Sequence, residues 1–180
     1  MASPLFRAKT IDRPRMQAII AAHPRAAVFE DCTLEGGDFS RLDMDGFQFT
    51  QCAIAGTTWL AASLEETVWS RCRGAQADFS ATHLSDAQFS YCYLNNSHWR
   101  RATLSSVRFT DCKLTGAQLQ EAGGWLLSFR DCLLVSADLR GLSFRKAELE
   151  GNDFPRRTCP ASISAGRCSG VAACATRRPG

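Results

Sequence analysis

The chain has 180 residues and a formal net charge of +3, from 21 basic and 18 acidic side chains. It contains no P-loop, no Rossmann glycine fingerprint and no HExxH motif, and its three histidines have no partner in a fixed register, so we expect neither an enzyme nor a bound cofactor or metal. The first ten residues lack the apolar stretch of a signal peptide, and no apolar run is long enough to span a membrane, so we expect no membrane contact.

Residues 1–26 are predicted to form a leader with a short capping helix at 10–23. Asp12 is suited to cap the N-terminus of this helix and Pro14 to lie in its first turn, while Pro24 ends it. The apolar stripe of the helix, which would cover the first unit of the repeat that follows, is Met16, Ile19 and Ile20. This leader carries five basic residues and one acid, a net charge of +4.

Six cysteines then recur at strict intervals of 20 residues: Cys32, Cys52, Cys72, Cys92, Cys112 and Cys132. Within that period, every fifth residue from Phe29 to Phe154 is large and apolar, except at Gly74 and Gly124. A helix would space apolar residues by 3.6 and a strand by 2, so a spacing of five indicates one side of a four-sided coil. A small residue usually lies two positions before each large one, as a narrow interior requires. The large residues of one side are Phe29, Phe49, Trp69, Phe89, Phe109 and Phe129.

This pattern resembles the pentapeptide-repeat family, whose consensus is A(D/N)Lxx, most plainly in ADFSA (77–81), ADLRG (137–141), GAQL (116–119) and KAELEG (146–151). The resemblance implies an all-β fold, a right-handed, four-sided β-helix whose coils stack through backbone hydrogen bonds. Two other solenoid classes fit poorly: leucine-rich repeats have no five-residue period, and hexapeptide β-helices require a period of six. We expect this solenoid over residues 27–155, in about six coils and roughly 29 Å tall, followed by a disordered basic tail at 156–180.

The cysteine column is predicted to be structural. Stacking places successive thiols about 4.8 Å apart on one inner side, a distance that permits disulfides, but the side chains run parallel and the coils are already hydrogen-bonded. Metal sites need convergent ligands, typically with CxxC-type spacing, and the repeat offers no such pair. Buried cysteine acts as a small hydrophobe, so we expect packing. Nine cysteines, mostly reduced, favour a cytoplasmic location.

Five carboxylates are predicted to share one outward side over three successive coils: Asp43, Asp45, Glu65, Glu66 and Asp86. Trp125 and Leu126 lie farther along the same side, and the adjoining side carries Arg100 and Arg101. Two interpretations stay open for this side: a solvated polar surface, or a partner-binding face with Trp125 and Leu126 as its apolar anchor. A local distortion, where Gly124 replaces an inward side chain, would also expose these two residues.

The resemblance suggests a function, because the best understood members of the family mimic B-form DNA, bind DNA gyrase or topoisomerase IV, and in some cases confer fluoroquinolone resistance. The acidic side would then act as a DNA mimic that modulates quinolone action. Two departures weaken this hypothesis: the C-terminal sequence does not look like a dimerisation module, and the coils after residue 88 are neutral to basic.

The alternative is a generic protein-interaction scaffold or a delivered bacterial effector, which would bind through Trp125, Leu126 and the region of Arg100 and Arg101. Both hypotheses require a protein partner and predict no direct binding to nucleic acid, since the N-terminal coils are acidic. A homodimer through the C-terminal coil also stays open.

Overall fold

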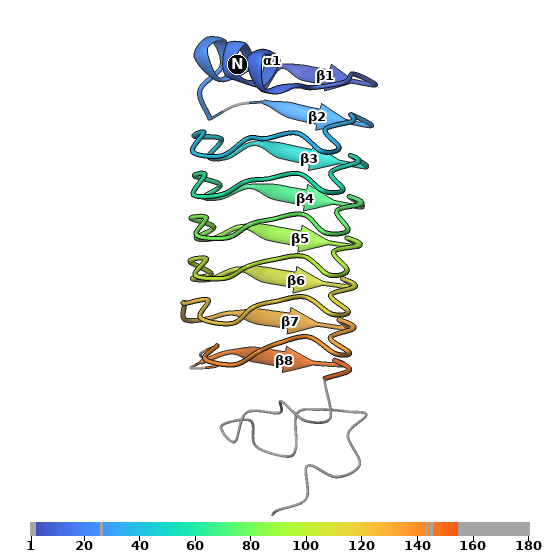
Figure 1. Cartoon of the computed structure of the whole chain (residues 1–180), viewed down its shortest axis with the longest axis vertical. Coiled ribbons are helices and arrows are strands. Elements are labelled where there is room, and N and C mark those ends of the chain that lie inside the picture. Colours follow the sequence, from blue (N-terminus) through green and yellow to red (C-terminus); the bar gives the residue numbers. More distant parts are fainter. Residues whose placement is uncertain (1–2, 26, 143, 145, 155–180) are drawn as a thin grey trace, which may run out of the picture.

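The computed structural model describes residues 3–25, 27–142, 144 and 146–154, which form a column of stacked coils (Figure 1). Its elements, in chain order, are β1 (Leu5–Arg7), α1 (Arg13–Ala22), β2 (Val28–Glu30), β3 (Gln48–Thr50), β4 (Val68–Ser70), β5 (Gln88–Ser90), β6 (Arg108–Thr110), β7 (Ser128–Arg130) and β8 (Glu148–Glu150). The tail predicted at 156–180 lies outside the described residues.

The coils repeat after 20 residues. All eight strands form one parallel sheet in chain order, and the register pairs Phe29 with Phe49 and Phe49 with Trp69. The other sides of neighbouring coils are joined by single parallel bridges, such as Thr33 with Ala53. The predicted all-β solenoid, with a short helix at its N-terminal end, is confirmed.

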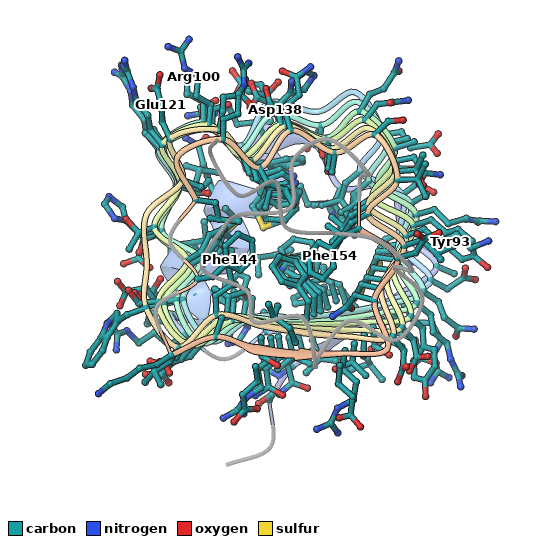
Figure 2. The ribbon with its side chains drawn as sticks, turned by 90° about the horizontal axis from the view of Figure 1, so that it is seen from below. Tyr93, Arg100, Glu121, Asp138, Phe144 and Phe154 are labelled. Carbon is teal, nitrogen blue, oxygen red and sulfur yellow. The ribbon has the colours of Figure 1, made fainter. Side chains whose placement is uncertain are left out.

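The coil is square when it is viewed along its axis (Figure 2). We name the four sides by their residues in the first full coil, and each side repeats every 20 residues. Face A is 27–31, face B is 32–36, face C is 37–41 and face D is 42–46. Faces A and C therefore lie opposite each other, as do faces B and D.

The corners between faces share one backbone conformation. Every fifth residue from Asp31 to Gly151 has a positive φ, between 51° and 74°. This conformation is uncommon for residues with a side chain, yet most corners carry one, including Arg71 and Tyr91. Hydrogen bonds between coils hold these positions, as when the Arg71 amide donates to the Ser90 carbonyl at 2.9 Å. Corner side chains therefore project from a fixed backbone, a feature that the five-residue spacing alone did not predict.

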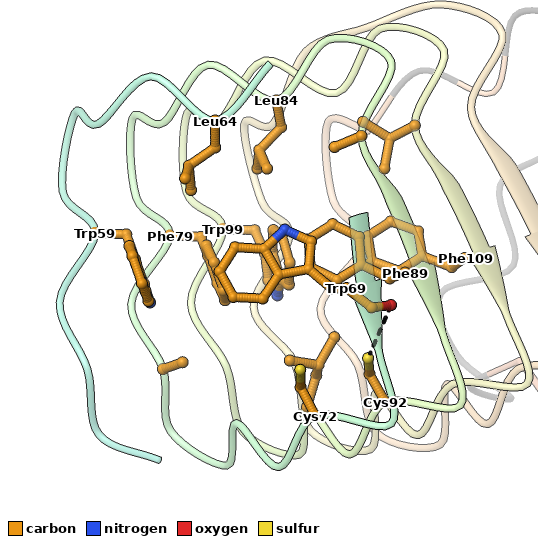
Figure 3. Close-up of a cluster of buried hydrophobic side chains, with 14 of the residues drawn as sticks. Trp59, Leu64, Trp69, Cys72, Phe79, Leu84, Phe89, Cys92, Trp99 and Phe109 are labelled. Atoms are coloured by element: carbon orange, nitrogen blue, oxygen red, sulfur yellow. Dashed lines mark hydrogen bonds between the residues drawn. The ribbon is translucent and has the colours of Figure 1, made fainter. Parts of the chain in front are cut away.

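Aromatic side chains fill the interior on faces A and C (Figure 3). On face A, Phe49 stacks on Trp69 with ring centroids 4.0 Å apart, and Trp69 meets Trp59 of face C edge-on at 5.3 Å. The buried residues include Phe29, Phe49, Trp69, Phe89, Phe109 and Phe129 on face A and Cys32, Cys52, Cys72, Cys92, Cys112 and Cys132 on face B.

Each of the three buried tryptophans has a hydroxyl group two residues before it. The indole Nε1 donates to that hydroxyl in the pairs Trp59–Thr57 at 2.7 Å, Trp69–Thr67 at 2.9 Å and Trp99–Ser97 at 2.7 Å. A buried indole N–H requires an acceptor. The small inward residues before the tryptophans therefore provide a hydrogen-bond acceptor as well as fitting the narrow interior. The sequence interpretation assigned them only the requirement of small volume.

The N-terminal segment contributes more than a helix. Strand β1 pairs with β2, and the ring of Phe6 stacks on that of Phe29 with centroids 5.4 Å apart. Residues before α1 thus add part of a coil, where the sequence interpretation placed only a leader. The side chain of Asp12 accepts a hydrogen bond from the Arg15 amide at 2.9 Å, which confirms it as the N-cap of α1. The helix then covers the end of the solenoid (Figure 1).

The predicted stripe of α1 is only partly buried: Met16 and Ile19 are buried, while Ile20 is half-buried against the core. These contacts close one end of the repeat, where an open coil would otherwise leave a free edge.

Candidate protein-binding surfaces

Four of the five predicted carboxylates of face D are accessible. Asp43, Glu66 and Asp86 are exposed and Glu65 is half-buried. Glu66 and Asp86 occupy the same corner in adjacent coils, so they project from equivalent positions about 4.8 Å apart along the axis. Among the residues that the structure describes, no basic nitrogen lies within 4.0 Å of these four carboxylates.

Asp45 is different, and its predicted place on the outward acidic surface is wrong. It is only 7% exposed. Its carboxylate accepts hydrogen bonds from the Ser63 hydroxyl at 2.7 Å and from the Glu65 amide at 2.9 Å, and it pairs with Arg25 at 3.3 Å. Its hydrogen-bonding capacity is used within the fold, because the chain brings the leader against the first coil. Asp45 is therefore a structural residue.

Basic residues of the leader pair with the first acidic coil. The ion pairs are Arg7–Glu30 at 2.6 Å, Arg13–Asp38 at 3.5 Å and Arg25–Asp45 at 3.3 Å. The sequence places these charges in separate segments, but the fold brings them together. The acidity of the N-terminal coils is consequently lower at the surface than the sequence count suggests, and it is concentrated on face D.

Trp125 and Leu126 lie on face D and are exposed, at 56% and 43%. A Cβ atom on Gly124 would lie 2.6 Å from the carbonyl carbon of Leu104, whereas one on Gly123 would meet nothing within 4 Å. The backbone at Gly124 thus approaches the preceding coil closely, and this coil has no large inward side chain on face D. Both the exposed aromatic residue and the local irregularity that the sequence suggested are present.

The basic region on face C is partly neutralised. Arg100 and Arg101 both pair with Glu121, at 3.3 Å and 2.9 Å. Hydrogen bonds from Arg100 and then Arg101 lower the pKa of the Glu121 carboxyl. Arg100 and Glu121 lie together on one side of the square in Figure 2. These two arginines are therefore a weaker candidate for a partner contact than the exposed residues of face D.

The cysteine column of face B is buried, and its six thiols are free. Each thiol donates to backbone carbonyls, as Cys92 does to the Trp69 oxygen at 3.5 Å (Figure 3). The hydrogen bond with Cys52 raises the pKa of the Cys72 thiol to about 12, and burial adds to the shift. Among the described residues there is no cluster of three ligands that could hold a metal ion. The column acts as packing with weak hydrogen bonds.

Comparisons with known proteins agree with this geometry. Residues 42–119 match the model of the pentapeptide repeat region. Residues 42–119 therefore form a pentapeptide-repeat region. The exposed surfaces described above are the candidate binding surfaces of this repeat.

Solved structures of pentapeptide-repeat proteins are similar to this chain. HetL, a protein involved in heterocyst differentiation regulation in the cyanobacterium Nostoc, is 18% identical, with a TM-score of 0.52 over 84% of this chain and 68% of HetL. Rfr23 from the cyanobacterium Cyanothece is 14% identical, with a TM-score of 0.38 over 77% of this chain and 92% of Rfr23. At these identities the likeness to HetL establishes the fold alone.

The plasmid-mediated fluoroquinolone resistance protein QnrB1, in a trypsin-treated R167E form, is 21% identical, with a TM-score of 0.32 over 85% of this chain and 90% of QnrB1. No curated protein sequence matched this chain. Within the described residues, no helix has the length and apolar character needed to cross a membrane.

The sequence interpretation missed a further set of exposed residues on the solenoid. Tyr91 and Tyr93 project beside face B and are 53% and 48% exposed. Arg71 lies over the Tyr91 ring at 5.9 Å, and Lys113 lies over the Tyr93 ring at 4.9 Å. The signal was available, because the same register that places cysteines inward places their immediate neighbours outward.

Proposed function

We propose that this pentapeptide-repeat protein acts by binding a protein partner through face D, as a scaffold without catalysis. One observation carries the proposal. Four accessible carboxylates, which have no cationic partner among the described residues, and an exposed Trp125–Leu126 pair project from a single face. Leu126 occupies the same corner as Glu66 and Asp86, three coils beyond Glu66 and two coils beyond Asp86. A basic protein surface with an apolar pocket would complement both parts.

The size of the face constrains the partner. Six coils at about 4.8 Å each and five residues at about 3.3 Å give a flat area of roughly 480 Å². A standard interface buries about 800 Å² on each partner. A stable partner would therefore extend around the corners onto a neighbouring face, or the complex would be transient.

The finer form of the proposal is that the partner is DNA gyrase or topoisomerase IV and that face D acts as a DNA mimic that modulates quinolone action. The unpaired carboxylates support it, since mimicry requires negative charge that is free to meet a basic groove. A generic scaffold or delivered effector with another basic partner is the second candidate. The free, buried cysteines support a reducing compartment, so we propose the cytoplasm as the location for either.

The test is gyrase supercoiling of relaxed plasmid in the presence of increasing protein, with and without a fluoroquinolone. We expect inhibition or drug rescue by the native protein and its loss in the variant Asp43→Asn, Glu65→Gln, Glu66→Gln, Asp86→Asn. A matched control removes four exposed carboxylates elsewhere: Asp31→Asn, Glu35→Gln, Asp111→Asn and Glu148→Gln. Asp45 stays unchanged in both variants, because it is structural.

The outcome separates the candidates. If both variants lose the activity of the native protein to the same extent, the total charge of the protein matters and the position of the carboxylates on face D does not. If the native protein has no effect on gyrase, the topoisomerase hypothesis is wrong. The scaffold hypothesis is tested separately by the Trp125→Ser/Leu126→Ser variant, which should lose binding to the protein partner. Binding to a basic partner should also weaken steeply with salt if the carboxylates carry it.

A further inference from the structure

A cationic and aromatic patch lies on the side of the rod opposite face D. It consists of Arg71, Arg73, Tyr91, Tyr93 and Lys113, with Leu133 at its C-terminal edge, and we name it the tyrosine patch. All six residues are exposed. Figure 2 shows Tyr93 projecting from its side of the square, away from the edge that carries Arg100 and Glu121. None of these residues belongs to the surface proposed above.

The backbone fixes the spacing of the patch. Arg73 pairs with Tyr93, Tyr93 with Lys113 and Lys113 with Leu133 through parallel bridges, so these side chains form one outward column. Arg71 and Tyr91 occupy the corner beside this column in adjacent coils. Because the backbone is already fixed, it has little conformational freedom to lose on binding, which favours affinity.

The charges of the patch are not satisfied within the fold. In the part of the chain that the structure describes, no carboxylate lies within 4.0 Å of Arg71, Arg73 or Lys113. Arg71 and Lys113 instead lie over the two tyrosine rings, in a favourable cation–π contact. Exposed tyrosines beside arginines are the residue types that dominate binding energy in interfaces.

We propose that the tyrosine patch binds an acidic segment of a partner protein that also carries aromatic or aliphatic side chains. The three cations complement carboxylates, while the tyrosine rings and Leu133 supply the apolar contact. The patch spans four coils, or roughly 15 Å at about 4.8 Å per coil, which an extended segment of about five residues covers at about 3.3 Å per residue. The solenoid would then have two binding surfaces of opposite charge on opposite sides, because face D is acidic and the tyrosine patch is cationic.

The test is fluorescence anisotropy with a fluorescein-labelled peptide of alternating glutamate and phenylalanine, titrated with the full chain. We expect saturable binding, and at least tenfold weaker binding to the Arg71→Glu/Arg73→Glu variant and to the Tyr91→Ala/Tyr93→Ala variant. The matched control is Arg41→Glu/Arg108→Glu, which makes the same charge change at two exposed arginines outside the patch and should bind like the native protein. Circular dichroism establishes that every variant is folded.

Other outcomes overturn the proposal. If the patch variant and the control lose peptide binding to the same extent, the net charge of the protein and not the tyrosine patch is responsible for binding. Stronger binding of a labelled oligothymidine than of the peptide, lost in the patch variant, would assign the patch to single-stranded nucleic acid. Self-association that the same variant abolishes, measured by sedimentation, would make a second copy of the chain the occupant. Because the carboxylates of face D are intact in all these variants, failure here leaves the proposed function untouched.

Discussion

Two stretches of the solenoid share one backbone but fill it differently. In the aromatic segment, residues 49–109, rings of faces A and C meet edge-on at every level, with centroids 5.3–6.1 Å apart. In the leucine segment, residues 110–154, face C supplies Leu119 and Leu139 instead. The first stretch interlocks across the interior, and the second packs aliphatic side chains around the face-A ring of Phe129.

The difference shows how the interior controls the surface. Where the rings interlock, the packed side chains of each coil have little conformational freedom, and the outward side chains project from a regular backbone. Tyr91 and Tyr93 lie in this segment. The leucine segment accommodates Gly124, which contributes no inward side chain, and next to it Trp125 is exposed. The exposure of Trp125 thus coincides with a missing inward side chain, whereas Tyr91 and Tyr93 are outward by register.

The largest effect should come from removing a ring of the aromatic segment. Trp99 contacts Phe79 at 4.3 Å, Phe89 at 5.4 Å and Phe109 at 5.5 Å, measured between ring centroids. We expect Trp99→Ala to lower the free energy of unfolding by about 3–5 kcal/mol, since rigid neighbours cannot close the cavity. Urea denaturation followed by circular dichroism measures this.

The comparison variant is Leu139→Ala in the leucine segment, for which we expect about 2–3 kcal/mol, the lower part of the range for leucine. If the two substitutions lower the free energy of unfolding by the same amount, the interlocking rings do not make their segment more sensitive to a lost side chain. The distinction between the segments then fails.

A smaller effect should follow from restoring a side chain in the leucine segment. Gly124→Ala places a Cβ atom 2.6 Å from the Leu104 carbonyl carbon and 2.8 Å from the Ser105 nitrogen. Backbone atoms cannot yield as a side-chain end would, so we expect a loss of about 1–3 kcal/mol. Gly123→Ala is the matched control, because nothing lies within 4 Å of its Cβ position. Equal thermal denaturation midpoints for both variants would contradict this account of Gly124.

The repeat itself could be predicted from sequence because a solenoid makes its period visible: spacings of five and 20 residues set the faces, the register and the inward cysteines. Contacts between distant segments could not be predicted this way. Asp45 occupies an outward position in the pattern, yet Arg25 and Ser63 bury it. Strand β1 has no part in the five-residue spacing, and only its pairing with β2 reveals it.

The hydroxyl beside each buried tryptophan gives a third test. Thr67 accepts from the Trp69 indole at 2.9 Å and donates to the Leu64 carbonyl at 2.7 Å. Thr67→Val keeps the shape but leaves the indole N–H without its acceptor, so we expect a loss of about 1–3 kcal/mol. Thr67→Ser, which keeps the hydroxyl, should lose less. A larger loss for serine than for valine in chemical denaturation would show that the methyl group, not the hydrogen bond, stabilises this position.

The smallest effect at neutral pH should come from the cysteine column. We expect Cys72→Ala to cost about 1 kcal/mol at pH 7, a typical single-substitution effect. The pKa of Cys72 is raised from 9.0 to about 12, first by its hydrogen bond with Cys52 and also by burial. The folded thiol therefore stays neutral while the unfolded thiol ionises, so its contribution to stability is complete below pH 9 and is lost as pH rises towards 12. The native protein should lose more stability than the alanine variant over this interval, measured by urea denaturation at stepped pH. Parallel curves for the two proteins would mean that the thiol titrates alike in both states and is not held neutral by the fold.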